Sequence, residues 1–393
     1  MEFFATHIAN RIPLADPKAT VFFIYGVILT ALLLSISRSS RKQDFLDFSQ
    51  TEQLKGIAIL LIMIGHLNSN VLVTNACIPL WINNCGVYLF LFLSGYGLMR
   101  SQQLKSPTLA QFIKRRINRV FMPYWITTLL FLLLDYFLLS ETYPLKLITL
   151  TALGINFHLK LQLLDYARWF ITLILFFYFL FYVATRFKKL AIQLLVLTVV
   201  PITVCYLNYF FEIIAPYDPR IGFTHIPPAR GGWNPWHLFI LPFPAGFLAG
   251  VYVEKLRKIF PTAERFQWNG VYLALCFFSV FFFTAKTTVD HSVYGILSSS
   301  LIINISRLCL TLFAICMLVC LTSFNIRYRM LSLLGSVSYE LYLLHNAFMV
   351  KYDFILYRMP VRYSFPIFLA AICVAAYGLR RAVVSLQVRR KTL

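Results

Sequence analysis

Long apolar stretches with very few charges restrict how this chain can fold more than any other feature. The 393 residues are 59% hydrophobic and only 13% charged, whereas soluble domains carry about a quarter charged residues. Several stretches of about 18 residues or more are nearly free of charge, as expected of helices that cross a bilayer. We therefore predict an all-α, polytopic transmembrane helical bundle with about eleven spans.

The first predicted span is interpreted as an extra anchoring helix, because it lacks the cleavage site of a signal peptide. The stretch 143–157 is short and contains Lys146, and the charge rule argues against counting it as a span. The predicted spans are 19–36, 54–73, 82–99, 120–139, 168–185, 190–211, 236–253, 268–284, 294–322, 330–350 and 363–380. The expected division is an N-terminal extension (1–44), a membrane domain (45–385) and a basic cytoplasmic tail (386–393).

The formal net charge of +21 is explained by the topology of a membrane protein rather than by binding to a nucleic acid. Lys and Arg concentrate in loops on one side, and the positive-inside rule then places the N-terminus outside and the C-terminus in the cytoplasm. No soluble basic domain exists to hold a nucleic acid, so we expect no such partner. The eight cysteines form no metal-binding pattern, and no metal is expected. Whether Cys77 and Cys85, which flank one outer loop, form a disulfide is left open.

Two ionisable residues lie in the second predicted span, LKGIAILLIMIGHL. Lys55 and His66 are about three helical turns apart, so their side chains share one face about 16 Å apart along the helix. Lys55 lies at the membrane rim, whereas His66 lies deep, where ionisable side chains usually face a protein interior or a watery cavity. His66 is either a packing residue hydrogen-bonded across helices or a general base or nucleophile.

A basic cluster precedes the fourth predicted span, in KRRINRVFMPYW. Arg115, Arg116 and Arg119 are interpreted in two ways. They set the topology of the span, or they also bind a ligand with several phosphates, which suits their close spacing.

Other polar residues interrupt apolar stretches nearer the C-terminus. The segment SYELYLLH places Tyr339, Glu340, Tyr342 and His345 in one span, which favours a polar cavity over isolated structural roles. Arg307 lies in the middle of another predicted span and needs an acidic or anionic partner. Depth alone suggests Glu340 as that partner.

The motifs resemble those of the acyltransferase family 3 membrane proteins, typically bacterial enzymes that O-acylate cell-surface glycans. The resemblance rests on LKGIAILLIMIGHL, YLFLFLSGYGLM, RRINRVFMPYW, RWFITLILFFYFLFY and SYELYLLHNAF, in family order over about residues 50–350. The family's hallmark is an arginine followed, eleven positions later, by a histidine. Here Lys55 stands at the arginine position and His66 at the histidine position, so the charge is kept but the bidentate fork is lost. The family core has ten spans, which matches 54–380 with the first helix as an addition.

The resemblance implies a membrane O-acyltransferase, by default an O-acetyltransferase, in the bacterial cytoplasmic membrane. Acetyl-CoA would bind from the cytoplasm with its phosphates near Lys55 and the arginine cluster, and its thioester at His66. A hydroxyl of a cell-envelope glycan or lipid-linked sugar would approach from the outer side. Tyr339, Tyr342, His345 and the loop 212–235 would line that side. Direct transfer and an acyl-histidine intermediate both fit.

Two alternatives from other functional classes stay open. A transporter of a lipid-linked sugar or small solute would use the buried His, Arg and Glu as proton relays. The missing repeat symmetry argues against it. A non-catalytic scaffold in envelope assembly is the weaker alternative.

The role given to Lys55 leads to a first prediction. Lys55→Ala should raise the acetyl-CoA concentration needed for half-maximal CoA release by about tenfold or more, because a charge-assisted contact to phosphate is lost. Lys55→Arg should be tolerated, since the charge remains. Steady-state CoA release measures both variants, with Lys146→Ala as the control. An unchanged requirement in Lys55→Ala would exclude this role.

Overall fold

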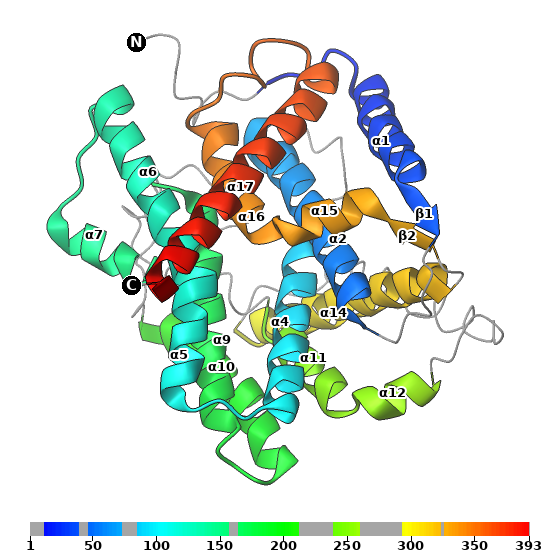
Figure 1. Cartoon of the computed structure of the whole chain (residues 1–393), viewed down its shortest axis with the longest axis vertical. Helices are drawn as coiled ribbons and strands as arrows, with labels where there is room; N and C mark the ends of the chain where they lie inside the picture. Colours follow the sequence, from blue (N-terminus) through cyan, green and yellow to red (C-terminus); the bar gives the residue numbers. More distant parts are fainter. Residues whose placement is uncertain are drawn as a thin grey trace.

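The computed structural model describes residues 12–38, 46–72, 85–156, 164–211, 239–259, 293–323 and 326–392, and this part is almost entirely helical (Figure 1). Its α-helices are α1 (Pro17–Leu34), α2 (Phe48–His66), α4 (Cys85–Leu104), α5 (Leu109–Arg116), α6 (Met122–Leu139), α7 (Leu145–Ala152), α9 (Trp169–Ala184), α10 (Leu190–Phe211), α11 (Pro242–Val251), α12 (Val253–Ile259), α14 (Val293–Ser323), α15 (Arg329–Ser336), α16 (Ser338–Val350) and α17 (Val361–Thr392). Short π-helical turns η2 (Leu67–Val71) and η3 (Ile117–Phe121) and a 3₁₀ turn η4 (Tyr166–Arg168) join some of them.

Within the described residues, four helical stretches are long and apolar enough to cross a membrane, namely Pro17–Leu34, Phe48–Val71, Leu109–Leu139 and Val361–Val388. Several shorter apolar helices accompany them. Large apolar side chains project outward from α1 and α17, including Phe22, Leu34 and Val374, which are 80%, 83% and 74% exposed. Such surfaces suit lipid rather than water. The helical membrane class is thus confirmed, while the count of about eleven spans stays a prediction.

Every predicted span except one overlaps a described helix or helix pair. The exception, 268–284, lies outside the described residues, as does the loop 212–235. The stretch 143–157 contains α7, whose eight residues extend only about 12 Å and cannot cross a hydrocarbon core of about 30 Å. The prediction that this stretch does not span is therefore supported.

The predicted single span 330–350 is wrong in one respect, because it consists of two helices. The backbone leaves the helical region at Val337, where φ is −114° and ψ is 17°. Helix α15 packs across α2, whereas α16 continues in another direction beside α17 (Figure 1). The apolar pattern does not reveal this bend, since residues on both sides of it are apolar.

Local sequence accounts for several helix starts. Asp47 accepts a hydrogen bond from the Gln50 backbone N–H at 2.8 Å and caps α2. Thr108 and Gln111 form a capping box at the start of α5, in which each side chain satisfies the other's backbone N–H. These caps fix where α2 and α5 begin; Lys55 lies about two turns into α2, and Arg115 and Arg116 lie in the last turn of α5.

One short ribbon departs from the all-helical prediction. Strand β1 (Ile36–Arg38) pairs antiparallel with β2 (Ile326–Tyr328), with Ile36 opposite Tyr328. The ribbon connects the end of α1 to the start of α15.

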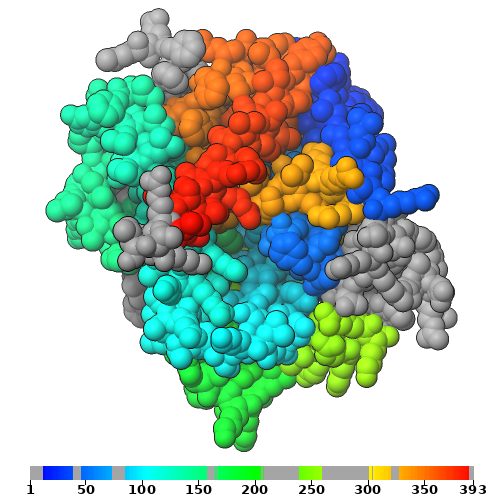
Figure 2. Space-filling model, viewed as in Figure 1, coloured from blue at the N-terminus to red at the C-terminus, as the bar shows by residue number. Residues whose placement is uncertain are grey.

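Figure 2 shows α17 lying across one face of the molecule, next to α15 and with its C-terminal half close to α5. The Gln387 side chain there donates to the Asn118 carbonyl at 2.6 Å.

Glycines allow the central helices to approach very closely. At Gly56 of α2 and Gly335 of α15, an added Cβ would collide with the backbone of the other helix. Gly95 of α4 and Gly246 of α11 make the same kind of contact. Small residues at helix crossings are typical of membrane bundles, where close packing replaces the hydrophobic effect as a source of helix association. These two crossings hold α2, α4, α11 and α15 in fixed positions around the interior.

The crossing of α4 and α11 gives a matched test on one helix. Gly95→Ala would push a methyl group into the Phe243 carbonyl and should lower the free energy of unfolding by about 1–3 kcal/mol. Gly97→Ala meets nothing within 4 Å and should be neutral or stabilising by up to about 1 kcal/mol, since alanine favours helix. Unfolding in detergent measures both. Equal effects of the two substitutions would contradict this packing.

Candidate functional site

The histidines of two distant segments meet inside the bundle. His66 lies in the last turn of α2 and His345 in the middle of α16. His66 Nδ1 and His345 Nε2 are 2.8 Å apart, a hydrogen-bond distance, and the rings lie nearly parallel with centroids 4.9 Å apart. Sequence reasoning selected both residues but assigned them no contact. The fold makes them one unit.

The hydrogen bonds around His345 specify the tautomer of both neutral rings. His345 Nδ1 lies 3.0 Å from the carbonyl oxygens of Leu341 and Tyr342 and therefore carries the proton it donates to them. His345 Nε2 is then an acceptor, so His66 Nδ1 must be the donor between the rings. With this assignment from partners, His66 Nε2 keeps an unprotonated lone pair. That nitrogen is suited to act as a base or nucleophile.

The two histidines differ in accessibility. His345 is fully buried, whereas His66 retains partial exposure. A π-helical turn, η2, begins directly after His66. Such turns interrupt regular α-helices frequently at functional sites, because the extra residue shifts the side chains that follow. His66 is thus the ring that a substrate can reach, and His345 supports it from behind.

A chain of amide and carboxylate side chains surrounds the histidine pair. Asn346, next to His345, donates to Asp165 Oδ1 at 2.7 Å and accepts from Asn70 Nδ2 at 3.0 Å. Asn70 in turn accepts from the Ser69 hydroxyl at 3.0 Å. The segment after His66 is therefore connected to the residue after His345. This arrangement limits relative movement of the two rings.

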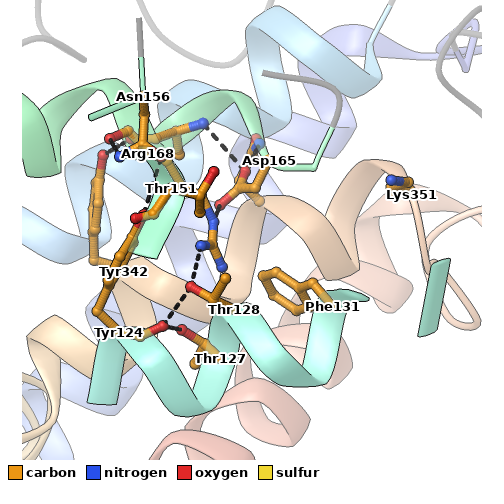
Figure 3. A network of polar contacts seen from close by, with 12 residues as sticks. Tyr124, Thr127, Thr128, Phe131, Thr151, Asn156, Asp165, Arg168, Tyr342 and Lys351 are labelled. Atoms are coloured by element: carbon orange, nitrogen blue, oxygen red, sulfur yellow. Dashed lines mark hydrogen bonds and ion pairs between the residues drawn. The ribbon is translucent and has the colours of Figure 1, made fainter. Parts of the chain in front are cut away.

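Arg168 is the centre of a second buried network, shown in Figure 3. Its side chain is 1% exposed, lies 3.9 Å from Asp165 and donates to the Thr128 hydroxyl at 2.6 Å. The guanidinium also lies over the rings of Tyr124 and Phe131, at 5.0 and 5.2 Å from their centroids. Sequence reasoning missed Asp165 and Arg168, although both occur in a polar DYAR segment that directly precedes a highly apolar helix.

A third buried cluster lies near the C-terminal end of α6. Lys351 Nζ is 2.6 Å from Asp135, and both side chains are nearly inaccessible, at 8% and 0% exposure. The hydroxyls of Tyr143 and Tyr352 donate to the same carboxylate at 2.7 and 2.5 Å. Burial and the nearby Asp135 raise the pKa of Tyr143, which lies outside the candidate spans, so its phenol stays protonated and donates. The cluster joins α6, the following loop and α16.

The residues predicted to bind the donor lie on three elements, α2, α5 and η3. Lys55 forms an ion pair of 3.2 Å with Glu52 on its own helix. Arg115 has a long contact of 3.3 Å with Ser101, and Arg119 is exposed. Arg116 instead stacks over Tyr178, 4.9 Å from the ring centroid, and over Phe112. Arg115 and Arg119 thus remain accessible to an anion, while aromatic rings hold Arg116.

Two expectations about the remaining polar residues are wrong. Tyr339 donates to the Val120 carbonyl at 3.0 Å, so it lies beside the basic segment and not on the acceptor side with His345. Glu340 interacts electrostatically with Arg380 of α17 and forms no ion pair with Arg307. Both residues precede His345 on α16 by about one turn or more, which places them towards the end of the helix nearest η3.

Tyr342 belongs to the candidate site as predicted. Its ring packs against His345 with centroids 5.8 Å apart, and its hydroxyl donates to the Ala167 carbonyl. Cys77 lies outside the described residues, so the question of whether it pairs with Cys85 stays open. Within the described ranges, no group of three His, Cys, Asp or Glu side chains is arranged to hold a metal ion.

The buried ion pair of Asp135 and Lys351 leads to a stability prediction. Asp135→Asn should lower the free energy of unfolding by about 3–5 kcal/mol, because the Lys351 charge stays buried without its carboxylate. The exposed pair Arg257–Glu254, 3.1 Å apart, is the control, and Arg257→Gln should cost at most about 1 kcal/mol. Denaturation of purified protein in detergent compares the two. A loss below about 1 kcal/mol for Asp135→Asn would contradict this reading of the cluster.

Comparison with protein families agrees with the geometry. The family model of acyltransferase family 3, described as an acyltransferase domain, matches residues 48–380. The match starts at the first residue of α2 and ends in α17, so it includes His66 and His345 and leaves α1 outside. No match was found among curated proteins or among solved structures. The chain therefore belongs to acyltransferase family 3 and is a membrane acyltransferase.

Proposed function

We propose that this protein is an O-acetyltransferase that moves an acetyl group from cytoplasmic acetyl-CoA to a hydroxyl of a cell-envelope glycan or lipid-linked sugar. The observation that carries the proposal is the hydrogen bond between His66 Nδ1 and His345 Nε2. It leaves His66 Nε2 as an accessible lone pair within an apolar bundle. Few side chains other than histidine can take up and release a proton at that depth.

In the direct route, His66 Nε2 removes the proton from the acceptor hydroxyl while the oxygen attacks the thioester carbonyl. The C–S bond then breaks, and the CoA thiolate takes the proton from His66. The His66 ring is positively charged between these two steps. Its Nδ1–H bond to His345 then becomes charge-assisted and stronger, which favours the charged state. His345 is therefore a positioning residue that selects the tautomer and stabilises the imidazolium.

The same pair also serves a two-step route. His66 Nε2 attacks the thioester, the CoA thiolate leaves, and the acetyl group is bonded to the ring. The proton on Nδ1 can pass to His345 Nε2, which leaves a neutral acetyl-imidazole. The acceptor hydroxyl then attacks the acetyl carbon, the bond from that carbon to Nε2 breaks, and the freed Nε2 takes up the hydroxyl proton. His345 Nε2 returns its proton to His66 Nδ1, and His66 Nε2 passes the hydroxyl proton on to the CoA thiolate, so both rings regain their original forms. Both routes need the His345 acceptor nitrogen.

The donor is proposed to bind at the end of the bundle that carries the basic segment. Lys55, Arg115 and Arg119 have exposed or partly exposed side chains there, and they would contact the CoA phosphates. Lys55 and His66 share a face of α2 about 16 Å apart. The pantetheine arm of CoA is long and flexible enough to extend along that face. Arg116 would support this surface from its place between aromatic rings.

The proposed location is the bacterial cytoplasmic membrane, with the N-terminus outside and the C-terminus in the cytoplasm. Under this orientation α2 runs from the cytoplasmic face towards the outer face, so His66 lies nearer the outer side. The acceptor would then enter from the side opposite the donor. This separation of entrances lets one histidine receive acyl groups from inside and deliver them outside.

The proposal predicts the effect of three substitutions on transfer. His66→Ala should reduce CoA release from acetyl-CoA at least about a hundredfold, because the group that accepts the proton is removed. His345→Leu should show a similar loss. His345→Gln should retain more activity, since its amide oxygen can still accept from His66 Nδ1. Purified proteins in nanodiscs are compared with and without membranes that contain envelope glycans.

Thermal unfolding of each variant serves as the folding control, with Gly97→Ala as a benign substitution in the same preparation. Normal turnover in His66→Ala would exclude the proposed role of this residue. Absence of CoA release by the wild type, even with envelope membranes, would overturn the transferase proposal.

A further inference from the structure

Three cations are deeply buried in the described part of the chain, and one of them has no carboxylate. Arg168 lies beside Asp165, and Lys351 contacts Asp135 at 2.6 Å. Arg307 of α14 is 7% exposed, and its Nε and Nη1 have no hydrogen-bond partner among the described residues. A charge buried in an apolar bundle is costly unless it is paired. Arg307 therefore has unused capacity to bind an anion.

The surroundings of Arg307 are aromatic and uncharged. Its guanidinium lies 5.9 Å from the ring centroid of Tyr88 and 5.7 Å from that of Phe239. The ionisable groups that interact with it are the Tyr88 phenol and the Cys85 thiol. Both side chains are neutral at neutral pH at their ordinary pKa values. The Tyr88 hydroxyl also forms a side-chain hydrogen bond with the guanidinium, whereas Nε and Nη1 are left without a partner among the described residues.

A second electropositive element lies at the same place. The Asn304 side-chain oxygen accepts hydrogen bonds from the Tyr88 hydroxyl at 2.9 Å and from the Ile240 and Leu241 N–H groups at 3.1 and 3.4 Å. Those N–H groups mark the start of α11, where the helix dipole is positive. Asn304 and Arg307 are three residues apart and share a face of α14. Asn304 already accepts from these first N–H groups, so α11 contributes the positive potential of its dipole beside a guanidinium that has no carboxylate partner in the described part of the chain.

Aromatic contacts connect Arg307 to the histidine pair. From Phe239 the contacts pass in order through Trp169, Phe170, Tyr342 and His345, with ring centroids 5.2, 6.2, 5.2 and 5.8 Å apart at successive steps. The Arg307 site therefore belongs to the same packed interior as the candidate reaction centre. It is separate from Lys55 and the arginines of α5–η3, to which the donor phosphates are assigned.

We propose that Arg307 binds an anionic group of the acceptor, either the carboxylate of an acidic sugar or the phosphate of a lipid-linked sugar. The acceptor role rests on the proposed transferase function, whereas the anion site itself does not. Nε and Nη1 lie on opposite sides of the planar guanidinium, so one charge-assisted hydrogen bond from either of them would hold the anion. An acceptor held in this way would be selected by charge as well as by its hydroxyl.

Binding in the absence of acetyl-CoA tests the site independently of catalysis. Two matched pairs of probes are used: cellobiouronic acid with cellobiose, and polyprenyl phosphate with polyprenol. Wild-type protein in nanodiscs should bind the charged member of at least one pair about tenfold more tightly or better, as expected for a charge-assisted contact. Arg307→Gln should remove this preference, and Arg307→Lys should retain part of it. Arg362→Gln, which removes an arginine on α17, should leave it unchanged.

The outcomes separate the sources of the anion. A preference only within the lipid pair assigns the site to a lipid phosphate, and a preference only within the sugar pair assigns it to a carboxylate. Equal binding of charged and neutral members, or no binding of any probe, overturns the proposal. The proposal is also overturned if a folded Arg307→Gln protein binds neither the charged nor the neutral member of a pair, since Arg307 would then have a structural role. A charge preference without acetyl transfer would keep the anion site and reject the transferase function.

Discussion

The need to satisfy polar groups inside an apolar bundle organises this protein. Lipid provides no hydrogen bonds, so each buried donor, acceptor or charge must find its partner within the chain. Asp165 supports Arg168 and Asn346, and Asp135 supports Lys351. Asp165 and Arg168 are neighbours in one short turn, whereas Asn346 and Lys351 meet their carboxylates from segments far apart in sequence, so these two contacts hold separate segments together. Arg307 does not meet this requirement within the described chain, because its neighbours there are aromatic and uncharged.

Close helix packing places the histidines within hydrogen-bond distance. The crossing at Gly56 and Gly335 fixes α15 against α2, and the bend at Val337 then directs α16 along the interior. His345 reaches His66 only because both conditions hold. A larger residue at either glycine would move α15 outward and α16 with it. The reaction centre thus depends on backbone contacts several turns away from its side chains.

The hydrogen bond between the rings has a chemical consequence that neither histidine has alone. Backbone carbonyls of α16 hold the proton on His345 Nδ1, and this in turn specifies which nitrogen of His66 is free. The accessible His66 ring therefore presents the lone pair of its Nε2, while the buried His345 ring accepts the hydrogen bond from His66 Nδ1. The division of tasks follows from exposure and from hydrogen-bond geometry.

Sequence reasoning predicted the helical membrane class, the family and the polar residues His66, Tyr342 and His345. It could do so because charge-poor stretches and ionisable residues within them are visible in one dimension. It failed for the proposed pairing of Arg307 with Glu340, which was based on depth, because depth does not specify which helices are neighbours. It also missed Asp165 and Arg168, since their importance comes from contacts with α6 and α16.

By itself, the sequence determined that the chain enters a membrane as apolar helices, where its deep ionisable residues lie along those helices, and to which family it belongs. Only the tertiary structure decided which of these residues meet. Hydrophobicity and helical period act along one segment, whereas pairing across segments depends on packing, on glycine contacts and on the bend at Val337. That is why the tautomer of His66 and the unpaired guanidinium of Arg307 emerge only from the folded protein.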